Sequence, residues 1–556
     1  MLAAIAFAMR RALPVCLAVG GVLLFVLGLH WPLPLHALDW HAPSAFGGGH
    51  VWAFQMIERM VAGDLPLRLE SNHLGFPITR SARFIGWFPA LLALPLQRLL
   101  GPVGAFHAVL WLSPSLAALA AYGWLRQATP GSRGLAAAAA SLYALSPYML
   151  SNLAAGNVDK LQTAFYPAWL ALVWWMLASP GRLRVLVLLP LLGAAMAFTE
   201  PYFALFLPLF AAPMLGARAW KERDRAMAQR GFAALVATGL GVFPAAWYYG
   251  PTQQDGQLFQ PADGKMNIGV LQDVDASPWK LLFGSPERIQ SATEVLHAPA
   301  VGVALVLLAV LVSTRAFRGR LAGLVLAAAG LVLVLGTEQG GLPMPMALLE
   351  ALGYPLGIGG QYYRASPVLT LGLLTLVAGG LGRQERWVAA LVPLQLVQAL
   401  WITGPFWPRP AQPIAGLEVL EAMQELGQPF EGVATLPVSS SQVQNDVRIV
   451  GAAIHRHPST VLPRHAEDPT SSAEYAWAWE VAEEGVPALN RGGLRLVLLY
   501  RTMDPGLDPP ALQEPALREL LGEPDLEDEH LLAWEVPVSA GSGARRPGSH
   551  PRPGGP

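Results

Sequence analysis

Long apolar runs separated by short polar segments dominate the pattern of residues along the chain, and they predict membrane-spanning helices. Eleven such runs cover residues 12–30, 105–125, 135–151, 164–179, 184–199, 201–216, 232–250, 298–314, 320–336, 366–381 and 387–404. The segment 88–100 is shorter and contains two prolines. Because a crossing takes about 20 residues, we predict a re-entrant or interfacial segment there.

Residues 31–87 form a long polar segment between the first apolar run and all the others. Between Gly49 and Ala62 an apolar face alternates with a polar one at helical spacing: Val51, Phe54, Ile57, Met60 and Val61 on one side, and Gln55, Glu58 and Arg59 on the other. This pattern predicts an amphipathic helix that lies on the membrane surface. Most connections in a compact bundle are short, so a loop of this length is expected to be folded and functional.

The pattern changes character after residue 404, where charge rises and helical periodicity falls. Strand-like runs at 432–438, 494–500 and 531–536 are mixed with helix-like stretches at 416–426 and 472–484. Residues 405–538 are therefore predicted to form a small α/β or α+β domain. Residues 539–556 consist mainly of Gly, Pro, Ser and Arg and are expected to be a disordered tail.

Composition places the chain among membrane proteins, since 53% of its residues are hydrophobic and 13% are charged. Its mean hydropathy is +0.40. Residues 1–404 are thus predicted to form an all-α polytopic bundle. The formal net charge of −1 and the scattered arginines indicate no nucleic-acid partner. Cys16 is the only cysteine, which excludes an internal disulfide and a Cys-based metal site.

Basic residues predict the orientation of the bundle. Arg10 and Arg11 precede the first apolar run, so the N-terminus is expected in the cytoplasm by the positive-inside rule. We favour an uncleaved first helix, although Leu35-His36-Ala37 leaves a signal-peptide cleavage site open. The later connections that fall on the same side carry Arg126, Arg133, Arg182, Arg184, Arg218, Lys221, Arg223, Arg225, Arg230, Arg315, Arg318, Arg320, Arg383 and Arg386. The loop 31–87 and the C-terminal domain are therefore predicted to be extracytoplasmic.

Long polar and aromatic loops are concentrated on that predicted outer side, which favours binding or chemistry at the outer interface. A secondary transporter more often carries polar groups at mid-membrane on broken, repeated helices. The sequence shows no convincing internal repeat and no ionisable residue deep inside a predicted span, and His107 comes closest to one.

Several stretches resemble the bacterial branch of the GT-C superfamily. They are "GGGHVWAFQMIERMVAGDLP" followed by "GFP", "SLYALSPYMLSNLAAGNVDKLQTAFYPAWLAL", "FTEPYFALF", "YYRASPVLTLGLL", "ATLPVSS" and "GGLRLVLLYRTMDP". The resemblance covers nearly the whole chain. It implies a multi-pass protein of the bacterial inner membrane, with membrane lipid and a polyprenyl-phosphate sugar as partners, that transfers the sugar at the extracytoplasmic face.

Members of the superfamily usually place an acidic residue at the start of the first-loop helix, as catalytic base or metal ligand, where this chain reads Gly49-His50. The role then moves to Asp39, or His50 takes it, or catalysis is lost. A carboxylate suits the role because the acceptor hydroxyl must lose a proton as the anomeric centre is attacked. Histidine is also a suitable base, with an unperturbed pKa of about 6.5. Asp39 as an ordinary loop acid and His50 as an ordinary helix-start residue remain open.

Three further polar residues lie on predicted outer loops. Glu200, at a corner between two apolar runs, is a candidate second acid that completes a carboxylate pair or holds a divalent cation. Asp159 and Lys160, in "GNVDK", are candidates to contact substrate hydroxyls and phosphate respectively. A solvated turn remains open as the alternative for each of the three.

Arg364 in "GGQYYRASP" is the candidate for phosphate recognition, because an arginine on the outer side runs against the positive-inside pattern. Its guanidinium matches a phosphate bidentately, and Tyr362 and Tyr363 are placed to flank a lipid or sugar. Snorkelling to lipid headgroups is the alternative.

His36, Asp39, His41 and His50 have the residue types of a Zn²⁺ or Mn²⁺ site, but their spacing is not that of a known motif, and no metal ligand is assigned. A divalent cation thus remains a candidate cofactor. The leading hypothesis is a membrane glycosyltransferase; the alternative is a non-catalytic multi-pass protein, either a lipid-linked glycan transporter or an assembly factor. The sequence specifies neither the sugar, the acceptor nor the oligomeric state.

Overall fold

The computed structural model describes residues 2–41, 47–65, 70–71, 80–81, 86–129, 131–178, 180–249, 282, 301–336, 338–339, 342–351, 362–382, 384, 392–394, 396–398, 400–401, 411–426, 431–438, 442–461, 473–504 and 509–537. The chain divides into two compact units. Unit 1 comprises Met1–Leu69 and Ala82–Pro413, and unit 2 comprises Glu70–Ser81 and Ile414–Pro556.

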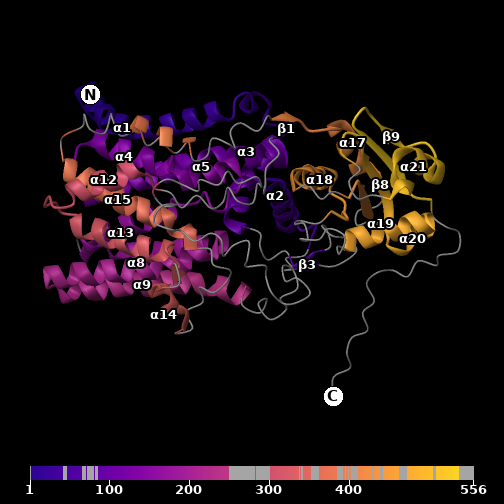
Figure 1. The fold of residues 1–556 in the computed structure, drawn as a ribbon. Helices are drawn as coiled ribbons and strands as arrows, with labels where there is room; N and C mark the ends of the chain where they lie inside the picture. Colours follow the sequence, from indigo (N-terminus) through magenta and orange to yellow (C-terminus); the bar gives the residue numbers. More distant parts are fainter. Residues whose placement is uncertain are drawn as a thin grey trace, which may run out of the picture. The chain divides into compact units, whose positions relative to one another are not determined.

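Unit 1 is a bundle of helices, several of which run alongside one another (Figure 1). Its described helices are α1 (Leu2–Leu29), α2 (Gly47–Ala62), α3 (Trp87–Ala128), α4 (Arg133–Ala144), α5 (Pro147–Ala154), α6 (Phe165–Leu177), α7 (Leu188–Thr199), α8 (Pro201–Glu222), α9 (Arg225–Tyr249), α12 (Val303–Val312), α13 (Arg320–Val334), α14 (Pro345–Ala351) and α15 (Ser366–Leu381). Short 3₁₀ helices are η1 (Leu33–His36), η2 (Pro180–Val187) and η5 (Tyr362–Ala365). Two-residue strands pair as β1 (Trp40–His41) with β6 (Gln412–Pro413), and β4 (Glu338–Gln339) with β5 (Leu342–Pro343).

Four of the described helical segments are long and apolar enough to cross a membrane: Ala12–Leu29, Trp87–Ala128, Pro201–Glu222 and Arg225–Trp247. Shorter apolar helices cover Phe165–Leu177, Arg184–Thr199, Val303–Val312, Arg320–Val334 and Ser366–Leu381. These segments coincide with nine of the predicted apolar runs, so the chain is a mostly helical, multi-pass membrane protein. Most of the run 387–404 lies outside the described residues, and the total of eleven spans stays a prediction.

Two segments have helix boundaries that differ from the predicted runs. The run 135–151 is divided between α4 and α5, because Ser146 is extended (φ −64°, ψ 158°) and Pro147 begins the next helix. A residue before proline is disfavoured in the helical region, which explains the break. The segment 88–100 is helical and continues into the following run as α3, with a kink at Gly101, whose φ is +67°.

Helix α2 forms where the amphipathic pattern predicts it, but its polar face is not solvated. Gln55 is 1% exposed and Arg59 is 9% exposed, whereas Val61, predicted on the apolar face, is 55% exposed. The α2 backbone is held by α3, since Gln97 Nε2 donates to the Phe54 carbonyl at 3.0 Å. Helical spacing assigned Gln55 and Arg59 to a solvated face, and the structure buries both, so the prediction of a helix with one buried and one solvated face was wrong for these residues. The position of this helix on the membrane surface stays a prediction.

Unit 2 contains a four-stranded sheet in the order β7 (Gly432–Leu436), β8 (Leu494–Tyr500), β10 (Leu531–Glu535) and β9 (Leu526–Glu527). Strands β7 and β8 are parallel, and the other pairs are antiparallel. The helical elements are α17 (Leu417–Ala422), η7 (Met423–Glu425), α18 (Gln442–His455), α19 (Ala473–Glu484), α20 (Val486–Arg491), η9 (Pro510–Leu512) and α21 (Glu514–Leu521). The strands β2 (Glu70–Ser71) and β3 (Arg80–Ser81) pair with each other. The strands predicted at 432–438, 494–500 and 531–536 and the helices predicted at 416–426 and 472–484 coincide with described elements.

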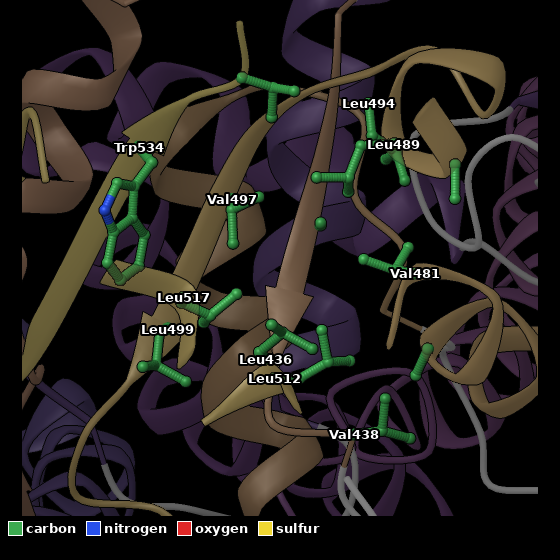
Figure 2. Packing of buried hydrophobic residues seen from close by; sticks show 14 of the residues in the cluster. Leu436, Val438, Val481, Leu489, Leu494, Val497, Leu499, Leu512, Leu517 and Trp534 are labelled. Carbon is green, nitrogen blue, oxygen red and sulfur yellow. The ribbon is translucent and has the colours of Figure 1, made fainter. Parts of the chain in front are cut away.

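The core of unit 2 consists of aliphatic side chains and Trp534, brought together by the sheet and by α19, α20 and α21 (Figure 2). Trp534 is 0% exposed, and its Nε1 donates to the Gly522 carbonyl at 3.0 Å. The indole therefore ties β10 to the end of α21.

We expect Trp534→Ala to lower the free energy of unfolding of unit 2 by about 3–5 kcal/mol, because the change opens a cavity and removes a buried hydrogen bond. Near-ultraviolet circular dichroism of the full-length protein during denaturant unfolding measures the change. Trp479, which is 43% exposed, provides the matched control: Trp479→Ala should have a much smaller effect. Equal losses in the two variants would contradict the assignment of Trp534 to the core.

Candidate functional site

Two connections of unit 1, the 3₁₀ helix η5 and the first turn of α2 bring polar and charged side chains toward one another. Asp159 and Lys160 lie in the loop 155–164 between α5 and α6, and Glu200 joins α7 to α8. Arg364 lies on η5 just before α15, and His50 lies in the first turn of α2. Glu200 is held in an extended conformation (φ −152°, ψ 106°) because Pro201 begins α8 directly after it. Helix ends and the segments between helices therefore position these five side chains, which we call the cluster.

Glu200 and Arg364 form a buried ion pair. The Nη1 atom of Arg364 donates to Oε1 of Glu200 at 2.5 Å, and the two side chains are 9% and 11% exposed respectively. The guanidinium also lies over the ring of Tyr202, with Cζ 4.5 Å from the ring centroid. A charge-assisted hydrogen bond and a cation–π contact therefore orient Arg364.

Asp159 and His50 face each other, with 3.8 Å between Oδ1 of Asp159 and Nδ1 of His50. Both side chains are largely buried, at 14% and 12% exposure. Asn157 forms a side-chain hydrogen bond with His50. The family resemblance placed an acid at the start of this helix, and the structure supplies a carboxylate to the same point from another loop.

The charges of Glu200 and Arg364 influence the pKa of Asp159. Burial and the charge of Glu200 raise the pKa of Asp159 well above its usual value, opposed by Lys160 and Arg364. Burial lowers the pKa of His50 to about 4; the hydrogen bond with Asn157 opposes this shift and the charge of Lys160 adds to it. At neutral pH His50 is therefore an uncharged imidazole, and Asp159 has the raised proton affinity of a base.

Gly86, which precedes α3, makes room for Asp159. A Cβ atom at Gly86 would collide with the Asp159 carboxylate, so only glycine allows this approach. Oδ1 of Asp159 is buried and has no hydrogen-bond partner among the described residues. Sequence reasoning missed Gly86 and Asn157; Gly86 directly before an apolar helix was the only local signal.

The remaining predicted site residues lie elsewhere or are not described. Asp39 lies beside His36, with 4.0 Å between Oδ1 of Asp39 and Nδ1 of His36, and the Asp39 side chain is 55% exposed. His41 is buried beside His107, with 6.1 Å between ring centroids. The side chains of Tyr362 and Tyr363 lie outside the described residues. Of the six candidates with described side chains, the structure brings together His50, Asp159, Lys160, Glu200 and Arg364, and places Asp39 in a different pair.

The described cluster does not match the donor set of a divalent cation. Within the described ranges, no three His, Cys, Asp or Glu side chains gather as metal ligands, so His36, Asp39, His41 and His50 do not form one site. Glu200 is engaged by Arg364, and Asp159 lies in the field of two cations. Hard cations favour several carboxylate or carbonyl oxygens, which this arrangement does not gather.

Comparison with solved structures identifies the fold. The archaeal oligosaccharyltransferase AglB from Archaeoglobus fulgidus, in complex with an inhibitory peptide and a dolichol-phosphate, aligns with a TM-score of 0.51 at 13% identity, over 88% of this chain and 70% of that one. The arabinofuranosyltransferase AftD from Mycobacteria aligns with a TM-score of 0.57 at 15% identity, over 94% of this chain and 40% of that one. The chain has a GT-C-like fold.

This GT-C-like chain matches no family model and no curated protein sequence. It spans less than half of the arabinofuranosyltransferase. At these identities the likeness concerns the fold alone.

Proposed function

We propose that the protein is a membrane glycosyltransferase that moves a sugar from a polyprenyl-phosphate donor to an extracytoplasmic acceptor. The observation that carries this proposal is the juxtaposition of a carboxylate of raised pKa, Asp159, with the buried cations Lys160 and Arg364. A glycosyl transfer from a lipid phosphate needs both parts: a base for the acceptor and positive charge for the leaving group.

In the proposed step an acceptor hydroxyl attacks the anomeric carbon of the donor. A bond forms between the acceptor oxygen and the anomeric carbon, and the bond from that carbon to the phosphate oxygen breaks. Asp159 takes the hydroxyl proton, and the polyprenyl phosphate leaves with the bonding electron pair. Lys160 and Arg364 stabilise the phosphate as its negative charge grows.

Each side chain then has a distinct task. Arg364 carries five N–H donors, so it serves Glu200 and a phosphate together, and Glu200 acts as the second acid that orients the guanidinium. His50 faces Asp159 as a neutral imidazole, with 3.8 Å between Nδ1 and Oδ1, and adds no charge of its own. Asp39 is replaced as the proposed base, because its exposed position beside His36 offers neither the burial nor the cationic neighbours of Asp159.

The structural neighbours support the donor class. The oligosaccharyltransferase carries a dolichol-phosphate, a lipid phosphate of the same chemical kind as the proposed donor. Within the proposal, the protein lies in the bacterial inner membrane with a cytoplasmic N-terminus. Residues 1–404 form the membrane domain and residues 405–538 an extracytoplasmic domain, whereas the tail predicted at 539–556 lies outside the described residues.

The direct test uses the full-length protein in detergent with radiolabelled polyprenyl-phosphate sugars of different sugar identity. We expect label to be transferred or released with at least one donor, and added polyprenyl phosphate to inhibit the reaction. No turnover with any donor, with equal lipid binding by wild type and by Asp159, Glu200 and Arg364 variants, would instead favour the non-catalytic alternative.

The raised pKa of Asp159 leads to a prediction for the pH dependence of transfer. Asp159 must be ionised to accept the proton, so the rate should fall as the pH falls through a pKa above the usual aspartate range. His50, with a pKa of about 4, should not titrate in that range. The groups that face Asp159 are His50 from α2, Lys160 from its own loop, Glu200 from the α7–α8 corner and Arg364 from η5.

Initial rates measured from about pH 5 to 8 in wild type and in His50→Asn check this assignment, since an ordinary histidine titrates within that range. The fall in rate at acidic pH should persist in His50→Asn. If the fall in rate at acidic pH disappears in His50→Asn, the group that titrates is the imidazole and not Asp159.

A further inference from the structure

We propose that the cluster around Asp159 acts without a divalent cation, with Lys160 and Arg364 bringing to the donor phosphate the positive charge that a metal ion would otherwise supply. This inference rests on the proposed function for its substrate. Its structural part, the inability of the cluster to hold a metal ion, is testable without any turnover.

The side chain at the start of the first-loop helix does not suit Mg²⁺ or Mn²⁺. The resemblance to the GT-C superfamily places a base or metal-ligating carboxylate at the start of the first-loop helix, where this chain has His50. Its Nδ1 faces Asp159 at 3.8 Å, and Asn157 hydrogen bonds to the same imidazole. Mg²⁺ and Mn²⁺ prefer oxygen ligands, so a neutral imidazole at this point removes both a negative charge and a preferred ligand.

The charges of the described side chains also disfavour a divalent cation. The carboxylates of Asp159 and Glu200 are balanced by the cations of Lys160 and Arg364, and the uncharged His50 adds nothing. Oε1 of Glu200 is 2.5 Å from Nη1 of Arg364, so a metal ion would have to displace the buried guanidinium to reach the Glu200 carboxylate. Among the described side chains, a divalent cation would therefore meet a cluster without net negative charge.

Both cations are buried. Taken as whole residues, Lys160 is 6% exposed and Arg364 is 7% exposed, which is unusual for charges that serve only solubility. Buried, oriented cations stabilise a developing phosphate charge more strongly than solvated ones, because less water screens them. Their position beside the proposed base gives the leaving phosphate a fixed partner in the protein.

The test restores the missing carboxylate. His50→Asp adds one negative charge and two oxygen ligands directly opposite Asp159, and His50→Asn is the uncharged control of similar size. Mn²⁺ titrations of the full-length proteins, followed by calorimetry and by the temperature of unfolding, measure binding directly. We expect saturable binding and a Mn²⁺-dependent rise in unfolding temperature in His50→Asp, and neither in wild type nor in His50→Asn.

A chelator provides a second measurement that does not depend on the folding of the aspartate variant. Wild-type transfer should show no loss after EDTA treatment and no gain on adding Mg²⁺ or Mn²⁺. Loss on EDTA treatment with recovery on metal addition, or saturable Mn²⁺ binding by wild type that Asp159→Asn removes, would overturn the inference. If no donor is turned over but the three Mn²⁺ titrations behave as expected, the proposed function fails and the account of the cluster stands.

Discussion

Asp159→Asn should abolish most glycosyl transfer, with kcat reduced by about 10²- to 10⁴-fold, the usual contribution of a positioned general base. The amide has the shape of the carboxylate but cannot take the acceptor proton. The substitution also leaves the space beside Gly86 filled as before, so the fold should be unchanged. Initial rates with the active labelled donor, together with KM, measure the effect, and KM should change much less than kcat.

Two matched variants make this result specific. Asp64 is an exposed acid that follows α2 in the same loop region, and Asp64→Asn should retain full activity. Asp39→Asn separates the structure-based assignment from the sequence-based one. Activity lost in Asp39→Asn but kept in Asp159→Asn would return the base to the residue that the sequence favoured.

The contrast between Asp39 and Asp159 shows what limits sequence reasoning here. Asp39 was chosen as the base because it lies near the end of the first predicted span, within the loop where the superfamily places its acid. Asp159 lies in a loop that is distant in the sequence, and only packing of the α5–α6 loop against α2 and Gly86 brings it to His50. Such a contact depends on tertiary packing, which hydrophobic periodicity does not encode.

Glu200 and Arg364 were identified from the sequence because each is a charged residue in an unusual place. Glu200 is an acid between two apolar runs, and Arg364 is a cation on the side where cations are rare. Both are costly to bury alone, so their positions implied partners, but only the structure shows that each is the other's partner.

Hydrophobic patterns predicted the apolar elements of the fold but failed where polar residues are buried. Runs of apolar residues predicted most described helices of unit 1, and β-branched and aliphatic runs predicted β7, β8 and β10. Helix α18 was missed because its segment, "QVQNDVRIVGAAIH", mixes polar residues with an apolar face, and Asp446 and Arg448 are buried in the structure. Solvation of a polar face was the wrong assumption there, as it was for Gln55 in α2.

Arg364→Ala should damage both stability and transfer. Removing the guanidinium leaves the Glu200 carboxylate buried without its ion-pair partner, and breaking a buried pair in this way costs about 3–5 kcal/mol of the free energy of unfolding. Transfer should also be lost, since the leaving phosphate loses a donor that Lys160 alone does not replace. Thermal unfolding in detergent and initial rates measure the two effects, with Arg98→Ala, an exposed site on α3, as the control.

The double variant Arg364→Ala/Glu200→Gln separates the two roles of Arg364. Neutralising Glu200 removes the buried charge, so much of the lost stability should return in a double-mutant cycle. Transfer should stay absent, because the phosphate still lacks its guanidinium. If activity recovers along with stability, Arg364 only neutralises Glu200, and other residues must bind the phosphate. If stability alone recovers, Arg364 acts on the leaving phosphate, and Glu200 is the acid that holds the guanidinium in place.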